Sequence, residues 1–150
     1  MGYNSTEYTQ TVTLNLQQAK DALQVQKALI DHGFKGSNAA LITAVTGVGL
    51  SLLSLIFLLP TAVTFAAGVT STALGLVPSE KAALEDMAGQ GRDSLSDIAL
   101  LMAGTQFDMV EVVLPKMKFV FNDSSKNWGM VSGKGRVTRM HSISGGWTLA

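Results

Sequence analysis

The chain has 150 residues, of which 47% are hydrophobic and only 15% are charged, and its formal net charge is zero. This composition excludes an intrinsically disordered chain, which combines low hydrophobicity with a high net charge. Without a cysteine, the chain has no disulfide scaffold, no thiolate metal site and no cysteine nucleophile. Its two histidines, His32 and His141, have no ligand pattern near them. We therefore predict a protein that is not an enzyme, with no catalytic residue, no cofactor and no metal.

The zero net charge conceals two unlike parts and a gap. Residues 1–115 carry five basic and ten acidic side chains, a net charge of −5, whereas residues 116–150 carry six basic and one acidic, a net charge of +5. Residues 36–79, a run of 44 residues, contain no ionisable side chain. Charge asymmetry of this kind points to a membrane surface, a nucleic acid or an acidic partner, or to pairing of the two parts within one folded body.

The first segment, residues 1–35, is expected to be helical. Val12, Leu14 and Leu16 alternate with polar residues as in a strand, but the spacing of the apolar residues that follow favours one amphipathic helix over residues 11–32. Asn15 is a candidate N-cap, and Gly33 would suit the C-terminal end.

The second segment, residues 36–78, reads as an uncharged apolar helical hairpin. Residues 39–59 would span about 31 Å as a helix, close to the roughly 30 Å of a bilayer core, and residues 61–77 lie at the short end of the spanning range. Pro60 predicts the break between the two helices. The residues taken to represent the membrane hairpin are Leu41, Leu52, Leu55, Phe57, Pro60 and Phe65. Small residues at four-residue spacing predict close helix packing at Gly47, Ser51, Ala67, Ser71 and Gly75.

The remaining chain is expected to hold acidic helices and then strands. Residues 79–105 predict two amphipathic helices, the first begun by Ser79 and Glu80 and interrupted at Gly89 and Gly91. Residues 106–150 alternate apolar and polar side chains on both sides of Pro115. Short strand patterns follow at 128–131, 136–140 and 147–149. The predicted fold class is therefore α+β: an N-terminal amphipathic helix, a central apolar hairpin, a further helix pair and a small antiparallel β-rich C-terminal part.

The basic C-terminal part, residues 106–150, also carries aromatic residues, a combination that favours an anionic membrane surface. The residues assigned to this contact are Lys116, Lys118, Lys126, Lys134, Arg136, Arg139, Trp128 and Trp147. A nucleic acid would use the same residue types and is kept as a less favoured partner. An equally favoured alternative to a membrane-binding surface is an ordinary sheet, with its lysines exposed to solvent and its aromatic residues buried in the core.

These features predict a small membrane protein that inserts its hairpin and self-associates into a pore or lesion, in the manner of a holin or a toxin. Lys35, Lys81 and the basic C-terminal part flank the hairpin, so the positive-inside rule places both termini in the cytoplasm. The expected partners are an anionic lipid membrane and further copies of the chain. The alternative is a soluble oligomeric interaction protein that buries the hairpin in its core or in a subunit interface.

Overall fold

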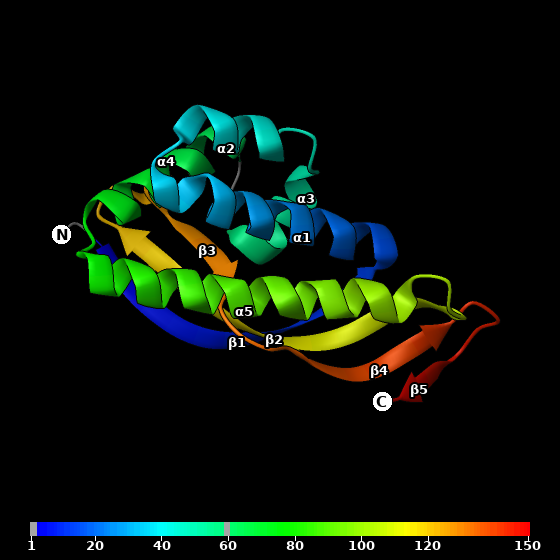
Figure 1. Cartoon of the computed structure of the whole chain (residues 1–150). Coiled ribbons are helices and arrows are strands. Elements are labelled where there is room, and N and C mark those ends of the chain that lie inside the picture. Colours follow the sequence, from blue (N-terminus) through cyan, green and yellow to red (C-terminus); the bar gives the residue numbers. More distant parts are fainter. Residues whose placement is uncertain (1–2, 59–60) are drawn as a thin grey trace.

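The computed structural model describes residues 3–58 and 61–150 and has the predicted α+β class (Figure 1). The helices lie above a curved antiparallel sheet. α5 runs along the sheet, and α2, α3 and α4 are at the end farthest from β4 and β5. In chain order the elements are β1 (Tyr3–Asn15), α1 (Leu16–Asp31), η1 (Gly33–Lys35), α2 (Asn38–Val45), α3 (Leu50–Phe57), α4 (Ala62–Leu74), α5 (Pro78–Met102), β2 (Phe107–Phe121), η2 (Ser124–Lys126), β3 (Trp128–Val131), β4 (Arg136–Ser142) and β5 (Trp147–Leu149).

The sheet is built around β2. β1 pairs with β2 along its whole length, from Tyr3 opposite Phe121 to Asn15 opposite Met109. The other edge of β2 pairs with β3 near Lys116–Phe119 and with β4 near Phe107–Val113, and β5 then pairs with β4. The first strand of the chain therefore pairs with a strand that begins about 90 residues after the first strand ends.

The expected helix over residues 11–32 is too long at its N-terminal end, because residues 11–15 belong to β1. Here the period-two alternation decides the structure. Val12 lies opposite Val112 and Leu14 opposite Val110, and all four side chains are buried. The predicted cap is confirmed: Asn15 Oδ1 accepts from the Gln18 amide at 2.8 Å. The Asn15 amide in turn donates to Gln18 Oε1 at 2.9 Å, which completes a capping box.

The expected helix pair over residues 79–105 is a single helix, α5, which begins at Pro78 rather than at Ser79. Glu80 does act in the first turn, because its Oε1 accepts from the Val77 amide at 3.1 Å. Gly91 does not interrupt the helix; it lets β3 approach. A Cβ at this position would lie 2.1 Å from the Val131 carbonyl oxygen, so only glycine fits there.

The predicted β-rich C-terminal part is present, and the strand limits expected at 128–131 and 147–149 are confirmed. Pro115 does not divide β2, which continues through it opposite Thr9. The Pro115 carbonyl accepts a hydrogen bond from the Ser132 amide at 2.9 Å. A proline is tolerated within a strand where its missing N–H is not needed for the ladder.

The uncharged hairpin differs from the expected pair of long helices. Residues 39–59 were expected to form one helix, but α2 ends at Val45 and α3 begins at Leu50. Gly49, in extended conformation, is the N-cap of α3, and Leu58 ends it with a left-handed backbone, φ 62°. The second expected helix is present as α4. The predicted break at Pro60 lies outside the described residues.

Candidate functional site: the uncharged helical layer

Residues 36–79, 44 residues without an ionisable side chain, contain α2, α3, α4 and the first two residues of α5 within their described part; we call residues 36–79 the uncharged layer. Its inner side belongs to the hydrophobic core. Of the residues assigned to a membrane hairpin, Leu55 is 37% exposed, Pro60 is outside the described residues, and Leu41, Leu52, Phe57 and Phe65 are buried. The apolar side chains of this layer thus have partners within the chain itself.

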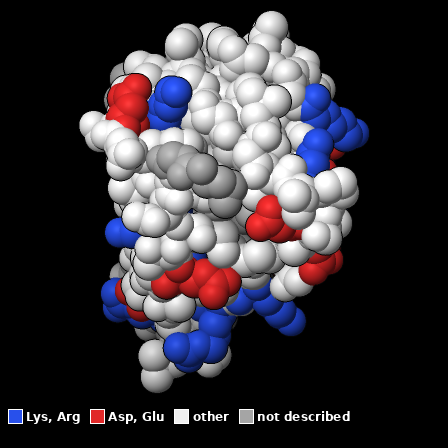
Figure 2. Space-filling view, turned by 90° about the vertical axis from the view of Figure 1, so that its left-hand side faces the viewer, with Lys and Arg blue, Asp and Glu red and all other residues white. Residues whose placement is uncertain are grey.

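The outer side of the uncharged layer still presents large apolar side chains. Val63 is 62% exposed, Leu74 is 81% exposed and Val77 is 54% exposed. Figure 2 shows the top of the molecule without charge, with basic and acidic groups at its sides and in its lower part. Scattered apolar side chains are normal on a protein surface, whereas a large contiguous apolar patch marks an interaction site.

The small residues predicted to pack helices do not mark the close contacts of this fold. Gly47, Ser51 and Gly75 are exposed, and a Cβ added at Gly47 would meet nothing within 4 Å. Ala67 and Ser71 are half-buried. The close approach in α4 is at Gly68, where a Cβ would lie 2.2 Å from the Lys126 carbonyl oxygen. A role of the five predicted residues in association between copies stays a prediction.

α4 is held to the sheet by an aromatic cluster around Trp128. The Trp128 ring stacks on Phe119 with centroids 4.4 Å apart and meets Phe65 of α4 edge-on at 6.0 Å. Its Nε1 donates to Thr72 Oγ1 at 2.9 Å, and that hydroxyl donates to the Gly68 carbonyl. Trp128 is fully buried, which corrects the expectation that it lies on the surface. The only exposed tryptophan is therefore Trp147.

α3 is held differently, by a lysine. Lys116 of β2 was expected on an anionic surface but is fully buried. Its Nζ donates to Gln10 Oε1 at 2.8 Å and to the Leu55 carbonyl of α3 at 3.2 Å. Burial lowers the pKa of the Lys116 ammonium to about 8, because the charged form loses its hydration. Burial also raises the pKa of the Tyr8 phenol, whose ring faces Lys116.

The other residues of the predicted basic surface are not gathered on one face around the uncharged layer. Lys118 is half-buried with its Nζ 5.6 Å from the Tyr8 ring centroid, and Lys126 lies in η2. Lys134 and Arg136 are exposed near the start of β4. Arg139 pairs with Glu111 at 3.0 Å and lies over the Trp147 ring. The β4–β5 end and the uncharged layer are at opposite ends of the molecule (Figure 1), so in this fold one flat bilayer would not contact both.

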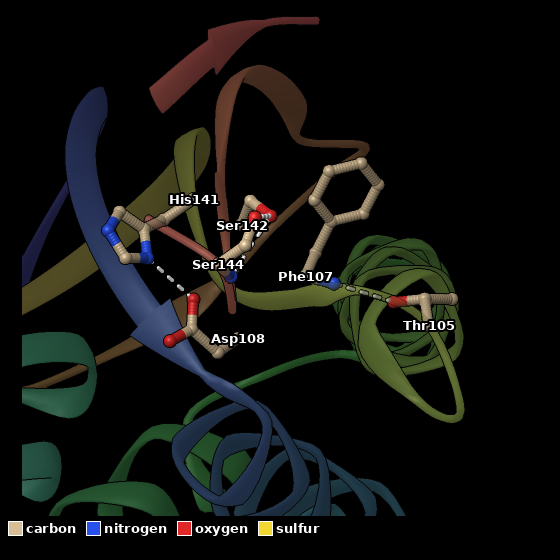
Figure 3. A network of polar contacts seen from close by, with 6 residues as sticks. All are labelled: Thr105, Phe107, Asp108, His141, Ser142 and Ser144. Carbon is tan, nitrogen blue, oxygen red and sulfur yellow. Dashed lines mark hydrogen bonds and ion pairs between the residues drawn. The ribbon is translucent and has the colours of Figure 1, made fainter. Parts of the chain in front are cut away.

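The sheet end also contains a histidine–carboxylate pair. The irregular register between Phe107 and Met109 places the Asp108 carboxylate 2.7 Å from His141 Nδ1. Figure 3 shows the His141 ring directed away from the neighbouring serines, Ser142 and Ser144, whose hydroxyls bond to each other at 2.9 Å. A nucleophile–base pair needs the serine hydroxyl to bond to the imidazole. Among the described residues this arrangement is not found, and no group of three or more potential metal ligands is present.

Two buried polar residues that the sequence analysis missed fix the helices to β3 and to the turn after it. The side-chain amide of Gln26 in α1 makes the two hydrogen bonds that a neighbouring strand would make. Its Nε2 donates to the Val131 carbonyl at 2.7 Å, and its Oε1 accepts from the Val131 backbone amide at 3.3 Å. Ser94 Oγ of α5 accepts from the Gly135 amide at 2.7 Å. The contact between Gln26 and Val131 had one signal in the sequence: a glutamine on the apolar side of the helix predicted over residues 11–32.

Protein-family models, curated proteins and solved structures gave no match to this chain. The remaining observation on function is one of length and composition. By length and composition, one stretch of the chain that the structure describes, Ser51–Leu74 with 24 residues, could cross a membrane, and its most apolar 18-residue window has a mean hydropathy of 2.1. Half of its most apolar window is buried in the fold, as in a core helix of a soluble protein. Leu58 interrupts its helical backbone.

Proposed function

We propose that the protein associates with lipid bilayers through the uncharged layer and inserts residues 39–77 as a helical hairpin when that layer leaves the sheet. The observation that carries this proposal is that one segment both lacks charge and exposes large apolar side chains. The layer has no ionisable side chain over 44 residues, and its outer side already exposes Val63, Leu74 and Val77. A single charged side chain at the centre of a bilayer costs about 2.5–3.5 kcal/mol on insertion scales. This segment carries none of that cost.

The buried inner side of the layer supports insertion from a closed form. Leu52, Phe57 and Phe65 are sheltered in the core, and exposing them to water would be costly, at about 1.5–3 kcal/mol for each side chain. A bilayer removes that cost because lipid chains replace the core contacts. Lys35 and Lys81 flank the layer, so the positive-inside rule keeps both flanks, and both termini, in the cytoplasm.

Self-association into a pore is the expected consequence of insertion. α4 carries hydroxyl groups on several sides: Thr61 caps the helix, Thr72 binds Trp128, and Thr70 Oγ1 is buried without a hydrogen-bond partner among the described residues. Released from the sheet and assembled with other copies, these hydroxyls would supply the polar lining that a wet path requires.

Liposome flotation with the purified protein tests the proposal. We expect the protein to float with vesicles that contain anionic lipid and to release an entrapped dye. Leu74→Glu places a charge on the exposed side of the layer, so it should abolish flotation without unfolding the protein. Leu100→Glu is the matched control, because Leu100 is 68% exposed on α5, outside the layer, and it should float as the unaltered chain does. Failure of the unaltered protein to float or to release dye would overturn the proposal.

A second candidate is a soluble oligomer that covers the outer side of the layer with another copy. The burial of the inner apolar side chains favours it, because these side chains already have apolar partners within the chain itself. Light scattering after size exclusion, without detergent or lipid, distinguishes the two. A defined oligomer that Leu74→Glu converts to a monomer, together with no flotation, would select this candidate.

A further inference from the structure

β1 is an edge strand of the sheet, and its free edge is long. It stands at one end of the strand order β1-β2-β4-β5 and, among the described strands, pairs with β2 alone. It has 13 residues, whereas an ordinary strand has about five or six. Its register with β2 is unbroken from Tyr3 to Asn15. An edge of this kind presents a row of unpaired N–H and C=O groups, which is a template for another strand.

Two contacts show which residues of β1 direct their backbone groups to the free edge. The Pro115 carbonyl of β2 accepts from the Ser132 amide, on the side of β2 that faces away from β1. Because hydrogen bonding alternates along an antiparallel ladder, Thr9, which lies opposite Pro115, directs its own groups away from β2. The Asn15 amide likewise bonds to Gln18 Oε1 at 2.9 Å and not to β2. The odd-numbered residues of β1 therefore face the free edge.

These outward backbone groups are accessible and without a partner among the described residues. The residues that carry them are Ser5, Glu7, Thr9, Thr11 and Thr13, and all five are exposed. The hydrogen bonds of the described residues outside the β1–β2 ladder include none to the backbone of these five. In the described structure only solvent satisfies them. A second strand could replace that solvent without displacing any part of the fold described here.

The other edges of the sheet are short or covered. β5, at the opposite end, has 3 residues, and Gln26 makes to Val131 of β3 the two hydrogen bonds of a neighbouring strand. β1 has none of the usual devices against edge pairing. It contains no proline, no lysine and no bulge, and Glu7 is its only charge. The open edge therefore favours a partner that supplies a strand.

β1 is suited to pairing with a second copy of itself. Thr9 is the middle residue of β1 and belongs to the outward row, so a two-fold axis beside Thr9 would pair the strand with its copy over its whole length. In that register Glu7 lies opposite Thr11 of the copy, and Ser5 lies opposite Thr13, so the one charge of β1 does not face its like. Each opposed outward pair exchanges two backbone hydrogen bonds, about ten in all, and opposed threonines pair favourably.

We propose that β1 is a dimerisation edge: two copies of the chain pair their β1 strands antiparallel across a two-fold axis at Thr9, and their sheets join into one. The inference does not rest on the proposed function, because β1 lies outside the uncharged layer. It also differs from an oligomer that covers the uncharged layer. Leu74→Glu, which places a charge on that layer, should therefore leave the β1 dimer intact.

Light scattering after size exclusion, without lipid and over a series of concentrations, tests the dimer in the Leu74→Glu chain. Thr9→Pro removes the N–H group at the two-fold axis, which the β1–β2 ladder does not use. It should raise the dissociation constant of the dimer at least about tenfold. Thr9→Val keeps that N–H group and is the matched control, with an unchanged dissociation constant. A monomer at every concentration, or a dimer that Thr9→Pro does not weaken, overturns the proposal.

Cross-linking tests the register and decides the matter if Thr9→Pro does not fold. Because the chain has no cysteine, Thr9→Cys introduces a single thiol. Across the two-fold axis the two Cα atoms at this position would be about 5.5 Å apart, within the range of a disulfide. Thr13→Cys, on the same row, is the matched control, since its two copies would be about 26 Å apart. Mild oxidation should link Thr9→Cys into a dimer and leave Thr13→Cys unlinked. Equal linkage of the two variants, or no linkage of Thr9→Cys, overturns the proposal.

Discussion

The uncharged layer and the β4–β5 end of the sheet treat charge in opposite ways. In the layer, residues 36–79 exclude every ionisable side chain, and one buried amine, Lys116, reaches α3 from the sheet. At the sheet end, charged groups are paired with each other, as Arg139 is with Glu111 at 3.0 Å. The low share of charged residues therefore reflects one region without charge, whereas the net charge of zero is the sum of −5 for residues 1–115 and +5 for residues 116–150. The uncharged layer is attached to the sheet by buried apolar contacts and a few hydrogen bonds, whereas β4 and β5 are held in place by strand pairing.

The two tryptophans give the sharpest version of this comparison. Trp128→Ala removes a fully buried ring, its stacking on Phe119 and its hydrogen bond to Thr72. We expect the free energy of unfolding to fall by about 3–5 kcal/mol, as is usual for a buried tryptophan. Trp147→Ala, at a 38% exposed position, should cost less than about 1 kcal/mol. Urea denaturation measures both; similar losses would show that the two regions are not held by different forces.

The next largest effect is expected at the contact between α5 and β3. Gly91→Ala would place a Cβ 2.1 Å from the Val131 carbonyl oxygen, and since that atom is backbone, helix and strand must separate. We expect a loss of about 1–3 kcal/mol or more. Gly89→Ala, two residues earlier in the same helix, meets nothing closer than 3.7 Å. It should stabilise the protein by about 0.5–1 kcal/mol through helix propensity alone, so a pair of variants with equal stability would contradict this packing.

The smallest effect is expected from the charge pairing at the sheet end. Hydrogen bonds from Arg139 and Thr138 lower the pKa of the Glu111 carboxyl below its usual value of 4.5. The pairing therefore stabilises the fold above the unfolded-state pKa and is lost as the pH falls through the folded-state pKa. Glu111→Gln should flatten the acid side of the stability curve slightly. Glu7→Gln, the same change in charge on exposed β1, serves as control, and an equal flattening there would argue against the pair.

Local signals in the sequence predicted much of the fold where a short-range cause was sufficient. The Asn15 cap depends on contacts three residues away, and the strand limits at 128–131 and 147–149 follow from alternation between glycine-rich turns. At residues 11–15 the sequence carried two competing signals, the strand-like alternation of Val12 and Leu14 and the helical spacing that follows, and pairing with residues 109–113 of β2 decided for the strand. The glycine at 91 was read as a helix breaker because its neighbour, Val131, is 40 residues away in the chain.

By itself, the sequence determined the α+β class and the absence of charge from residues 36–79, since composition and periodicity are properties of the chain alone. Only the tertiary structure decided which groups meet water. It buried Trp128 and Lys116, which composition had placed with the surface residues, and left Trp147 exposed. The physical reason is that burial depends on what lies opposite a side chain across the fold. For Lys116 the opposite groups are an amide of β1 and a carbonyl of α3.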